Sequence, residues 1–249
     1  MNKKIVFQFI ALTFLIAVLS WGICTLSGSF GYTVKNAQWL YVFVAFCAFS
    51  PTIASYVVLK KNNEVNGFKE WLKNIFTVKC SLRSYLFVLI LCVVFLIPQI
   101  IFGSEEVQPF YMFFALLPAT LIFGGIEEAG WRYVLQPELD KKFRLILSSI
   151  IVAVIWASWH ILVFLPQGRI ESIPWFALFA IDILGQSFAL GAIIRITKSV
   201  FLCVLFHTLT NAGSGVFNTA ETLYGSVLAA CLLIVISLLS VFIHEKQRQ

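Results

Sequence analysis

The sequence has few charged residues. Only 12% of its 249 residues are Asp, Glu, Lys or Arg, whereas charged residues make up about 25% of a typical soluble globular domain. Apolar residues make up 60% of the chain, and the mean hydropathy is +0.91. These values exclude a soluble globular protein and predict a protein that crosses a membrane several times.

Paired cysteines, internal repeats and low-complexity tracts are also lacking. Five of the six cysteines fall within apolar stretches and Cys80 lies in a loop, so no disulfide framework is expected. The net charge is +6, but the Lys and Arg residues are confined to short loops between apolar stretches. There they set membrane orientation, and we expect no nucleic-acid partner.

Eight stretches are long and apolar enough to cross a hydrocarbon core about 30 Å thick. Because backbone groups in lipid must be hydrogen-bonded internally, such long continuous stretches predict helices and not barrel strands. We therefore expect an all-α fold with a single transmembrane domain over residues 1–249. The predicted spans are Ile5–Leu26, Trp39–Leu59, Tyr85–Phe102, Pro109–Leu135, Leu145–Leu165, Pro174–Ile196, Val200–Phe217 and Thr222–Ile243.

The basic residues alternate with the eight spans. Fifteen lie at the chain ends and in the loops after the second, fourth and sixth spans, two lie in the other loops, and Arg132 lies within a span. An excess of Lys and Arg marks cytoplasmic loops, so both termini are predicted to be cytoplasmic. The first stretch follows Lys3 and Lys4 as in a signal sequence, but it is too long and has no cleavage site, so we expect a retained span.

The loop between the second and third spans is the only long one. Its apolar residues recur at helical spacing from Phe68 to Phe76, beside three lysines. Two interpretations stay open: a short helix in the cytoplasmic headgroup region, or an ordinary basic loop.

The fourth span contains the segment GGIEEAGWR, with three ionisable residues in an apolar run. Such residues inside a membrane indicate a functional site. Glu128 and Arg132 are four residues apart, share a helix face and can form a pair. Glu127 points about 100° away, and we expect an unpaired carboxyl suited to take and return protons. Three glycines should let a neighbouring helix or a substrate approach: Gly124, Gly125 and Gly130.

Two of the three histidines also lie within spans. His160 ends the segment WASWH, and His207 precedes Asn211 by one helical turn in FHTLTN. A lone buried histidine is usually a hydrogen-bonded core residue, but polar groups on three spans are each costly unless they meet. Convergence with Glu127 would form a cavity able to hold a divalent metal and its water, or to activate water directly.

Asp182 is a further acid within a span. Gln186 follows it by one helical turn, so the two can form a hydrogen bond. We favour structural pairing over catalysis for Asp182.

The order EExxxR, aromatic-xxx-His and HxxxN over successive spans resembles the CPBP intramembrane proteases, also called the CAAX protease and bacteriocin-processing or Abi family, which includes type II CAAX prenyl endopeptidases. The matching residues lie within a core region of residues 109–217. Trp156 stands where the family usually has Phe, and we expect this position to pack and not to react. The matches are Glu127, Glu128, Arg132, Trp156, His160, His207 and Asn211.

The resemblance implies hydrolysis of a peptide bond in a membrane-associated peptide or lipidated protein. Glu127 would activate water, His160 and His207 would surround that water, and Asn211 would stabilise the oxyanion. Glu128, Arg132 and Trp156 would support these groups. If the reaction uses a metal such as Zn²⁺, its ligands would be Glu127, His160 and His207; the sequence leaves metal-dependent and metal-free mechanisms open.

Two other functions compete with proteolysis. A non-catalytic immunity or scaffold protein of the same fold would bind a peptide or partner. A proton-coupled transporter would use Glu127, Glu128 and Asp182 as relay carboxylates. The resemblance and the short loops favour a protease of the bacterial plasma membrane, with a role in bacteriocin or signalling-peptide processing or in self-immunity.

Overall fold

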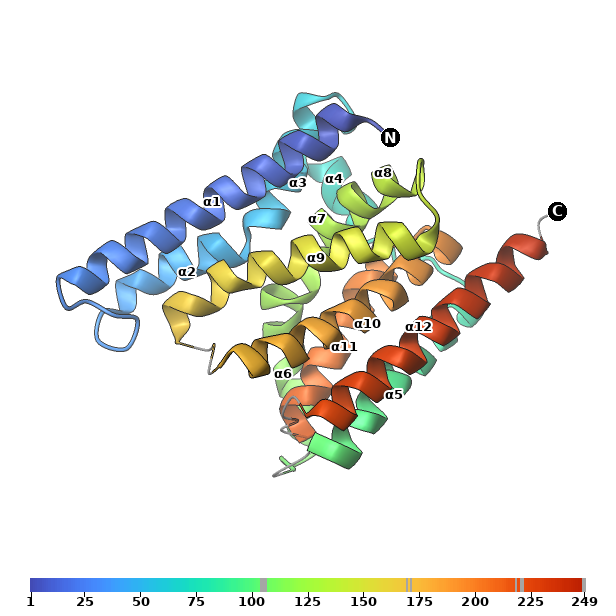
Figure 1. The fold of residues 1–249 in the computed structure, drawn as a ribbon. Coiled ribbons are helices and arrows are strands. Elements are labelled where there is room, and N and C mark those ends of the chain that lie inside the picture. Colours follow the sequence, from blue (N-terminus) through green and yellow to red (C-terminus); the bar gives the residue numbers. More distant parts are fainter. Residues whose placement is uncertain (104–106, 169, 171, 218, 220–221, 248–249) are drawn as a thin grey trace.

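The computed structural model describes residues 1–103, 107–168, 170, 172–217, 219 and 222–247, and the elements in this part of the chain are all helical. Seven helices are long and apolar enough to cross a membrane, and the count reaches eight if one bent pair forms a span. The predicted all-α membrane fold is therefore confirmed. Figure 1 shows both termini toward the upper right of the bundle, as expected for an even number of crossings.

Six predicted spans correspond to single helices. One of them has the predicted bounds, and the other ends differ by at most three residues. The helices are α1 (Lys3–Ser29), α5 (Leu82–Gly103), α9 (Leu145–Phe164), α10 (Ile173–Thr197), α11 (Val200–Phe217) and α12 (Leu223–Lys246).

The second predicted span is broken. It consists of η1 (Gln38–Leu40), α2 (Tyr41–Ala48) and α3 (Ser50–Lys61), and it bends by 48° between Ala48 and Ser50. Pro51 explains the break, because proline has no N–H to donate to a carbonyl one turn back and its ring collides with that carbonyl in a continuous helix. A continuous helix over Trp39–Leu59 is therefore wrong.

The fourth predicted span is one of the seven, over Tyr111–Asp140, but its helix is irregular at the segment that holds the glutamates. It runs through α6 (Tyr111–Phe123), the 3₁₀ turn η2 (Gly125–Glu127), α7 (Glu128–Gly130), the π-helical turn η3 (Trp131–Leu135) and α8 (Gln136–Asp140). Gly124 leaves the helical region with φ −143° and ψ −72°. Pro137 follows the π-helical turn, and a proline commonly forces such widening because its ring collides with a carbonyl one turn back.

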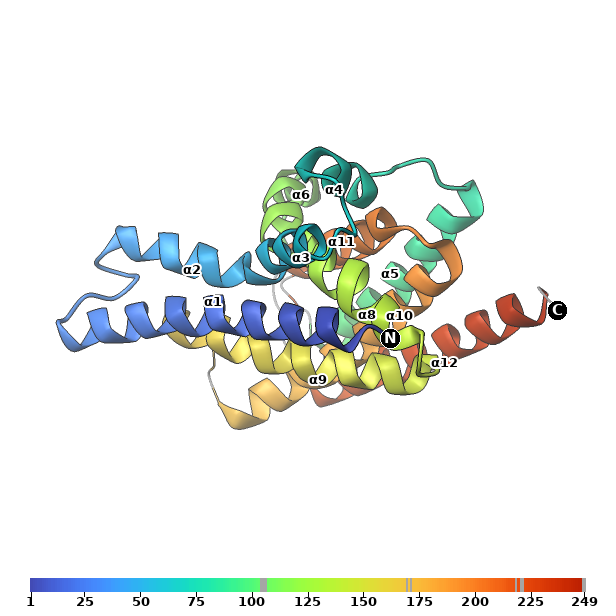
Figure 2. The same ribbon diagram turned by 90° about the horizontal axis from the view of Figure 1, so that it is seen from above.

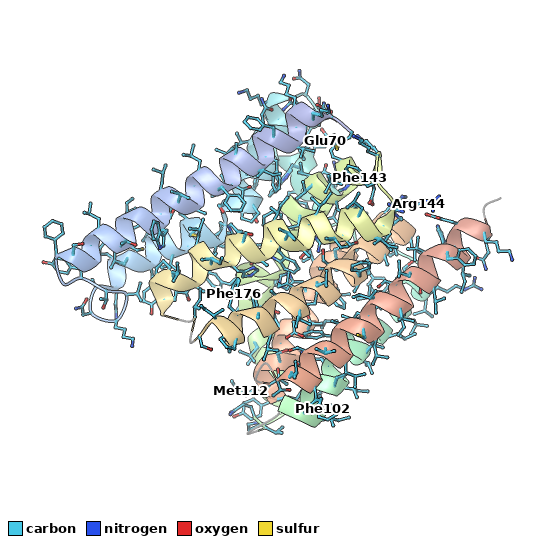
Figure 3. All side chains as sticks on the ribbon, in the orientation of Figure 1. Glu70, Phe102, Met112, Phe143, Arg144 and Phe176 are labelled. Atoms are coloured by element: carbon cyan, nitrogen blue, oxygen red, sulfur yellow. The ribbon has the colours of Figure 1, made fainter. Side chains whose placement is uncertain are left out.

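The bundle is built around α10 and α11. The first packs against α9 and α12, and the second packs against α5 and α6. Figure 2 shows α1 and α2 side by side, extending together away from the rest of the bundle. Large apolar side chains cover the outer faces, among them Phe7, Leu19 and Phe102, the last of which is labelled in Figure 3. Such a surface suits lipid and not water.

The long loop contains the helix α4 (Phe68–Ile75). Trp71 and Ile75 are buried, and the indole N–H of Trp71 donates to Ser55 Oγ at 3.0 Å. Of the two interpretations that the sequence left open, the loop contains the short helix, and a place for it in the headgroup region stays a prediction. Part of the predicted charge pattern lies outside the described residues: Glu105, Glu106, Arg169, Glu171, Glu221 and Arg248.

Candidate active site

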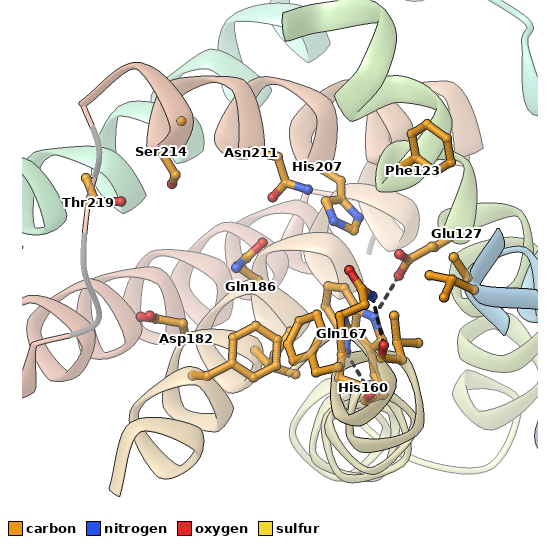
Figure 4. A pocket seen from close by; sticks show the side chains of 18 of the residues that line it. Phe123, Glu127, His160, Gln167, Asp182, Gln186, His207, Asn211, Ser214 and Thr219 are labelled. Atoms are coloured by element: carbon orange, nitrogen blue, oxygen red, sulfur yellow. Dashed lines mark hydrogen bonds between the residues drawn. The ribbon is translucent and has the colours of Figure 1, made fainter. Parts of the chain in front are cut away.

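A cavity of about 740 Å³ lies between α2, α5, α6, α9, α10 and α11. It is lined by residues from each of the three predicted motifs (Figure 4). The side chains that the sequence places on three spans therefore meet around one space, as their convergence required. These residues are Glu127, Trp156, His160, His207 and Asn211.

Glu127 ends the 3₁₀ turn η2, which follows the irregular backbone at Gly124. Its backbone N–H donates to the carbonyl of Gly124 at 2.9 Å, and its side chain is almost fully buried. The carboxylate Oε2 accepts the indole N–H of Trp156 at 3.0 Å. Glu127, expected to have no ion-pair partner, thus accepts a hydrogen bond, and Trp156, expected to pack, also donates one, because an indole carries an N–H.

Glu128 and Arg132 form the predicted ion pair, with 3.5 Å between Oε2 and Nε, and both side chains are fully buried. The other oxygen of Glu128, Oε1, accepts a hydrogen bond from Nδ1 of His207 at 2.9 Å. Arg132 also donates to Ser187 Oγ at 3.4 Å. Glu128 thus joins the first and third motifs, a link that sequence spacing along one helix does not reveal.

His160 lies one turn after Trp156 on α9, and its Nδ1 lies 2.9 Å from the Trp156 carbonyl oxygen. A carbonyl can only accept, so Nδ1 carries the proton, and a neutral ring then has its lone pair on Nε2. The rings of Trp159, Phe164 and Phe179 surround the imidazole, with centroids 4.8 to 5.0 Å away. The aromatic surround fixes the plane of the ring.

Asn211 reaches the cavity because Gly124 has no side chain. A Cβ at position 124 would lie 2.5 Å from Asn211 Nδ2 and 3.3 Å from His207 Nε2. Similarly, a Cβ at Gly125 would lie 2.3 Å from Thr208 Oγ1. These glycines allow η2 to pack closely on α11, so the expected role of the small residues is observed here.

Asp182 lines the same cavity but does not bond to Gln186. Its carboxylate accepts a hydrogen bond from Gln99 Nε2 at 2.7 Å and another from Ser226 Oγ at 3.0 Å. These bonds tie α10 to α5 and α12. The partner suggested by helical spacing is therefore wrong, although structural pairing itself is observed. Gln99 is a polar residue within an apolar span, and that signal could have identified it.

The sequence suggested Glu127, His160 and His207 as metal ligands. Among the residues that the structure describes, no three His, Cys, Asp or Glu side chains come together as a set that could hold a metal ion. Nδ1 of each histidine is engaged by a protein oxygen, so Nε2 is the nitrogen that either ring could offer to a ligand. Because the described side chains do not form a set of three ligands, the reaction proposed for this site uses only the side chains.

Comparisons with known proteins agree with this site. The family described as type II CAAX prenyl endopeptidase Rce1-like matches residues 87–213, just over half of the chain, and this range contains all seven motif residues. The chain is also 27% identical over 184 residues to CAAX prenyl protease 2 of Methanococcus maripaludis, covering 65% of this chain and 67% of that protein. With its apolar helices and this likeness, the chain belongs to the Rce1-like type II CAAX prenyl endopeptidases, a membrane-embedded endopeptidase family.

Proposed function

We propose that this protein hydrolyses peptide bonds inside the bilayer, with Glu127 activating the water. The observation that carries the proposal is the shared cavity: a buried carboxylate, two imidazoles and a primary amide face one space. Amide hydrolysis needs a general base, hydrogen-bond donors that polarise the scissile carbonyl, and a site shielded from bulk water.

The proposed reaction proceeds in two steps. The carboxylate of Glu127 takes a proton from water held beside His160, and the hydroxide bonds to the scissile carbonyl carbon. Asn211 Nδ2 and a protonated Nε2 of His207 donate to the resulting oxyanion, a contribution typically worth about 3–4 kcal/mol of the barrier. The C–N bond then breaks, and Glu127 returns its proton to the leaving amine, which leaves a carboxylic acid and a free amine as products.

The proposed substrate is a membrane-associated peptide or a lipidated protein. The related protein is named a CAAX prenyl protease, so a prenylated C-terminal peptide is the first substrate to test. We propose a multi-pass location in a bacterial plasma membrane with both termini cytoplasmic, where processing of a bacteriocin or signalling peptide or self-immunity would be its role. The charge pattern of the loops supports the orientation.

The test uses the full chain purified in detergent. We would measure cleavage of two peptide libraries, one with and one without C-terminal prenyl groups. Each library is assayed in the presence and in the absence of a chelator. Glu127→Gln and His160→Ala are expected to abolish cleavage while insertion and folding persist, and Glu64→Gln, at an exposed carboxyl, is the matched control.

Full cleavage by either site variant contradicts the proposal. A non-catalytic immunity or scaffold protein would instead keep its protective phenotype in the Glu127→Gln strain. Loss of cleavage with chelator, restored by Zn²⁺, would show that a metal takes part.

A further inference from the structure

The ring of Trp156 lies against several ionisable side chains of the candidate site, so this residue does more than fill space in the core. Its ring centroid lies 5.4 Å from that of His207 and 5.7 Å from that of His160. The guanidinium carbon of Arg132 lies 5.3 Å from the same ring. The side chain is fully buried, so all of these contacts are made away from bulk water.

The indole N–H gives this position a further property. It donates to Oε2 of Glu127 at 3.0 Å, and the indole of Trp131 is a second side chain that acts on the same carboxylate. A hydrogen bond to a charged acceptor is short and directional. It therefore restricts rotation of the carboxylate.

The backbone of Trp156 acts on the other group beside the water. Its carbonyl oxygen lies 2.9 Å from Nδ1 of His160, which places the proton on Nδ1 and fixes the tautomer of a neutral ring. One residue on α9 thus orients both Glu127 and His160, through its side chain and its main chain respectively.

We propose that Trp156 is a positioning residue whose indole N–H aims the Glu127 carboxylate at the attacking water. This inference rests on the proposed function, because it assigns Trp156 an action through Glu127. A phenylalanine would fill much of the same space and keep the backbone carbonyl, but it has no N–H. The hydrogen bond and the packing can therefore be separated by one substitution.

The experiment compares Trp156→Phe with Trp159→Phe. Both indoles are fully buried on α9, and the N–H of Trp159 donates to Ser50 Oγ at 2.9 Å and not to a site residue. Because the ring of Trp159 touches His160, this control also covers packing beside the histidine. Steady-state cleavage of the best library peptide gives kcat and KM, and thermal unfolding in detergent gives stability.

Trp156→Phe is expected to lower kcat about tenfold to a hundredfold, in line with loss of a hydrogen bond to a charged group. KM should stay within about twofold, because the N–H acts on the base and not on bound substrate. Trp159→Phe should lower the unfolding temperature by about as much as Trp156→Phe does, but it should have a much smaller effect on kcat. Equal losses of kcat in the two variants would overturn the inference, since packing would then account for both.

A second variant keeps the test decisive if Trp156→Phe does not fold. A tryptophan analogue with sulfur in place of the ring N–H, incorporated at position 156, keeps the bicyclic shape and removes only the donor. It is expected to reproduce the fall in kcat. Wild-type kcat with this analogue, while Glu127→Gln is inactive, overturns the role of Trp156 and leaves the proposed function standing. Cleavage by Glu127→Gln instead overturns the proposed function itself.

Discussion

The carboxylate of Glu128 accepts a hydrogen bond from Nδ1 of His207 at 2.9 Å, and this contact joins the fourth and seventh predicted spans inside the bundle. It directs the Nδ1 proton of the imidazole at Glu128, so that Nε2 is the nitrogen that faces the cavity, where it can donate when the ring is protonated on both nitrogens. The other carboxylate oxygen pairs with Arg132. Glu128 therefore has two effects. It stabilises the buried charge of Arg132, and it orients His207, a candidate oxyanion donor.

Glu128→Gln should affect folding and cleavage separately. Removing one partner of a buried ion pair typically costs about 3–5 kcal/mol, because the remaining charge is left unpaired. The free energy of unfolding, measured in detergent, should fall accordingly, and cleavage should fall as well. In the double variant Glu128→Gln with Arg132→Met, stability should partly recover while cleavage stays low. Recovery of both together would mean that Glu128 acts only through the ion pair.

Gly124→Ala tests the close approach of η2 to α11. The added Cβ would lie 2.5 Å from Asn211 Nδ2, closer than any stable contact, so the amide must move away from the cavity. We expect a loss of kcat of about a hundredfold, the scale of losing one oxyanion donor. Gly22→Ala is the control, since nothing lies within 4 Å of its added Cβ. Wild-type kcat in Gly124→Ala would show that the position of Asn211 does not matter.

The hydrogen bond between Gln99 and Asp182 should contribute to stability. Gln99→Leu leaves a buried carboxylate oxygen without that donor, which typically costs about 1–3 kcal/mol. Thermal unfolding of Gln99→Leu, Ser226→Ala and the double variant measures the loss and its additivity. Cleavage by folded protein should change little. A large loss of kcat in stable Gln99→Leu protein would instead assign Asp182 a part in the reaction.

Glu70 gives a pH-dependent contact outside the membrane spans. The backbone N–H and side-chain amide of Asn66 donate to its carboxylate at 2.8 and 2.6 Å, and these bonds, with the backbone one first, hold the pKa of Glu70 below its ordinary value. A lowered folded pKa means that the stabilisation is present above the unfolded value, about 4.3, and is lost as the pH falls through the folded pKa.

Amide hydrogen exchange at Asn66 measures this contact. Protection should be constant at neutral pH and should decline in acid, whereas Glu70→Gln should show weak protection that does not change with pH. Protection in the wild-type protein that is the same at every pH would contradict the assignment.

Sequence periodicity determined the helices wherever apolar residues run without interruption. Six spans were predicted to within three residues at each end, because a membrane requires long helices with internally bonded backbones. The same reasoning did not predict the bend at Pro51, or the irregular helix turns at Gly124 and before Pro137. A hydropathy pattern measures side-chain solvation, but a helix break depends on backbone donors and steric fit, which the pattern does not contain.

The composition of the site could also be predicted from the sequence, since an isolated Glu or His in an apolar span is costly and needs a partner. The identity of those partners was decided by the tertiary structure. Trp156 reaches Glu127, His207 reaches Glu128, and Asp182 bonds to Gln99 across helices. Hydrogen bonds depend on distances of about 3 Å between atoms that are far apart in the chain, and only the packing of the helices sets those distances.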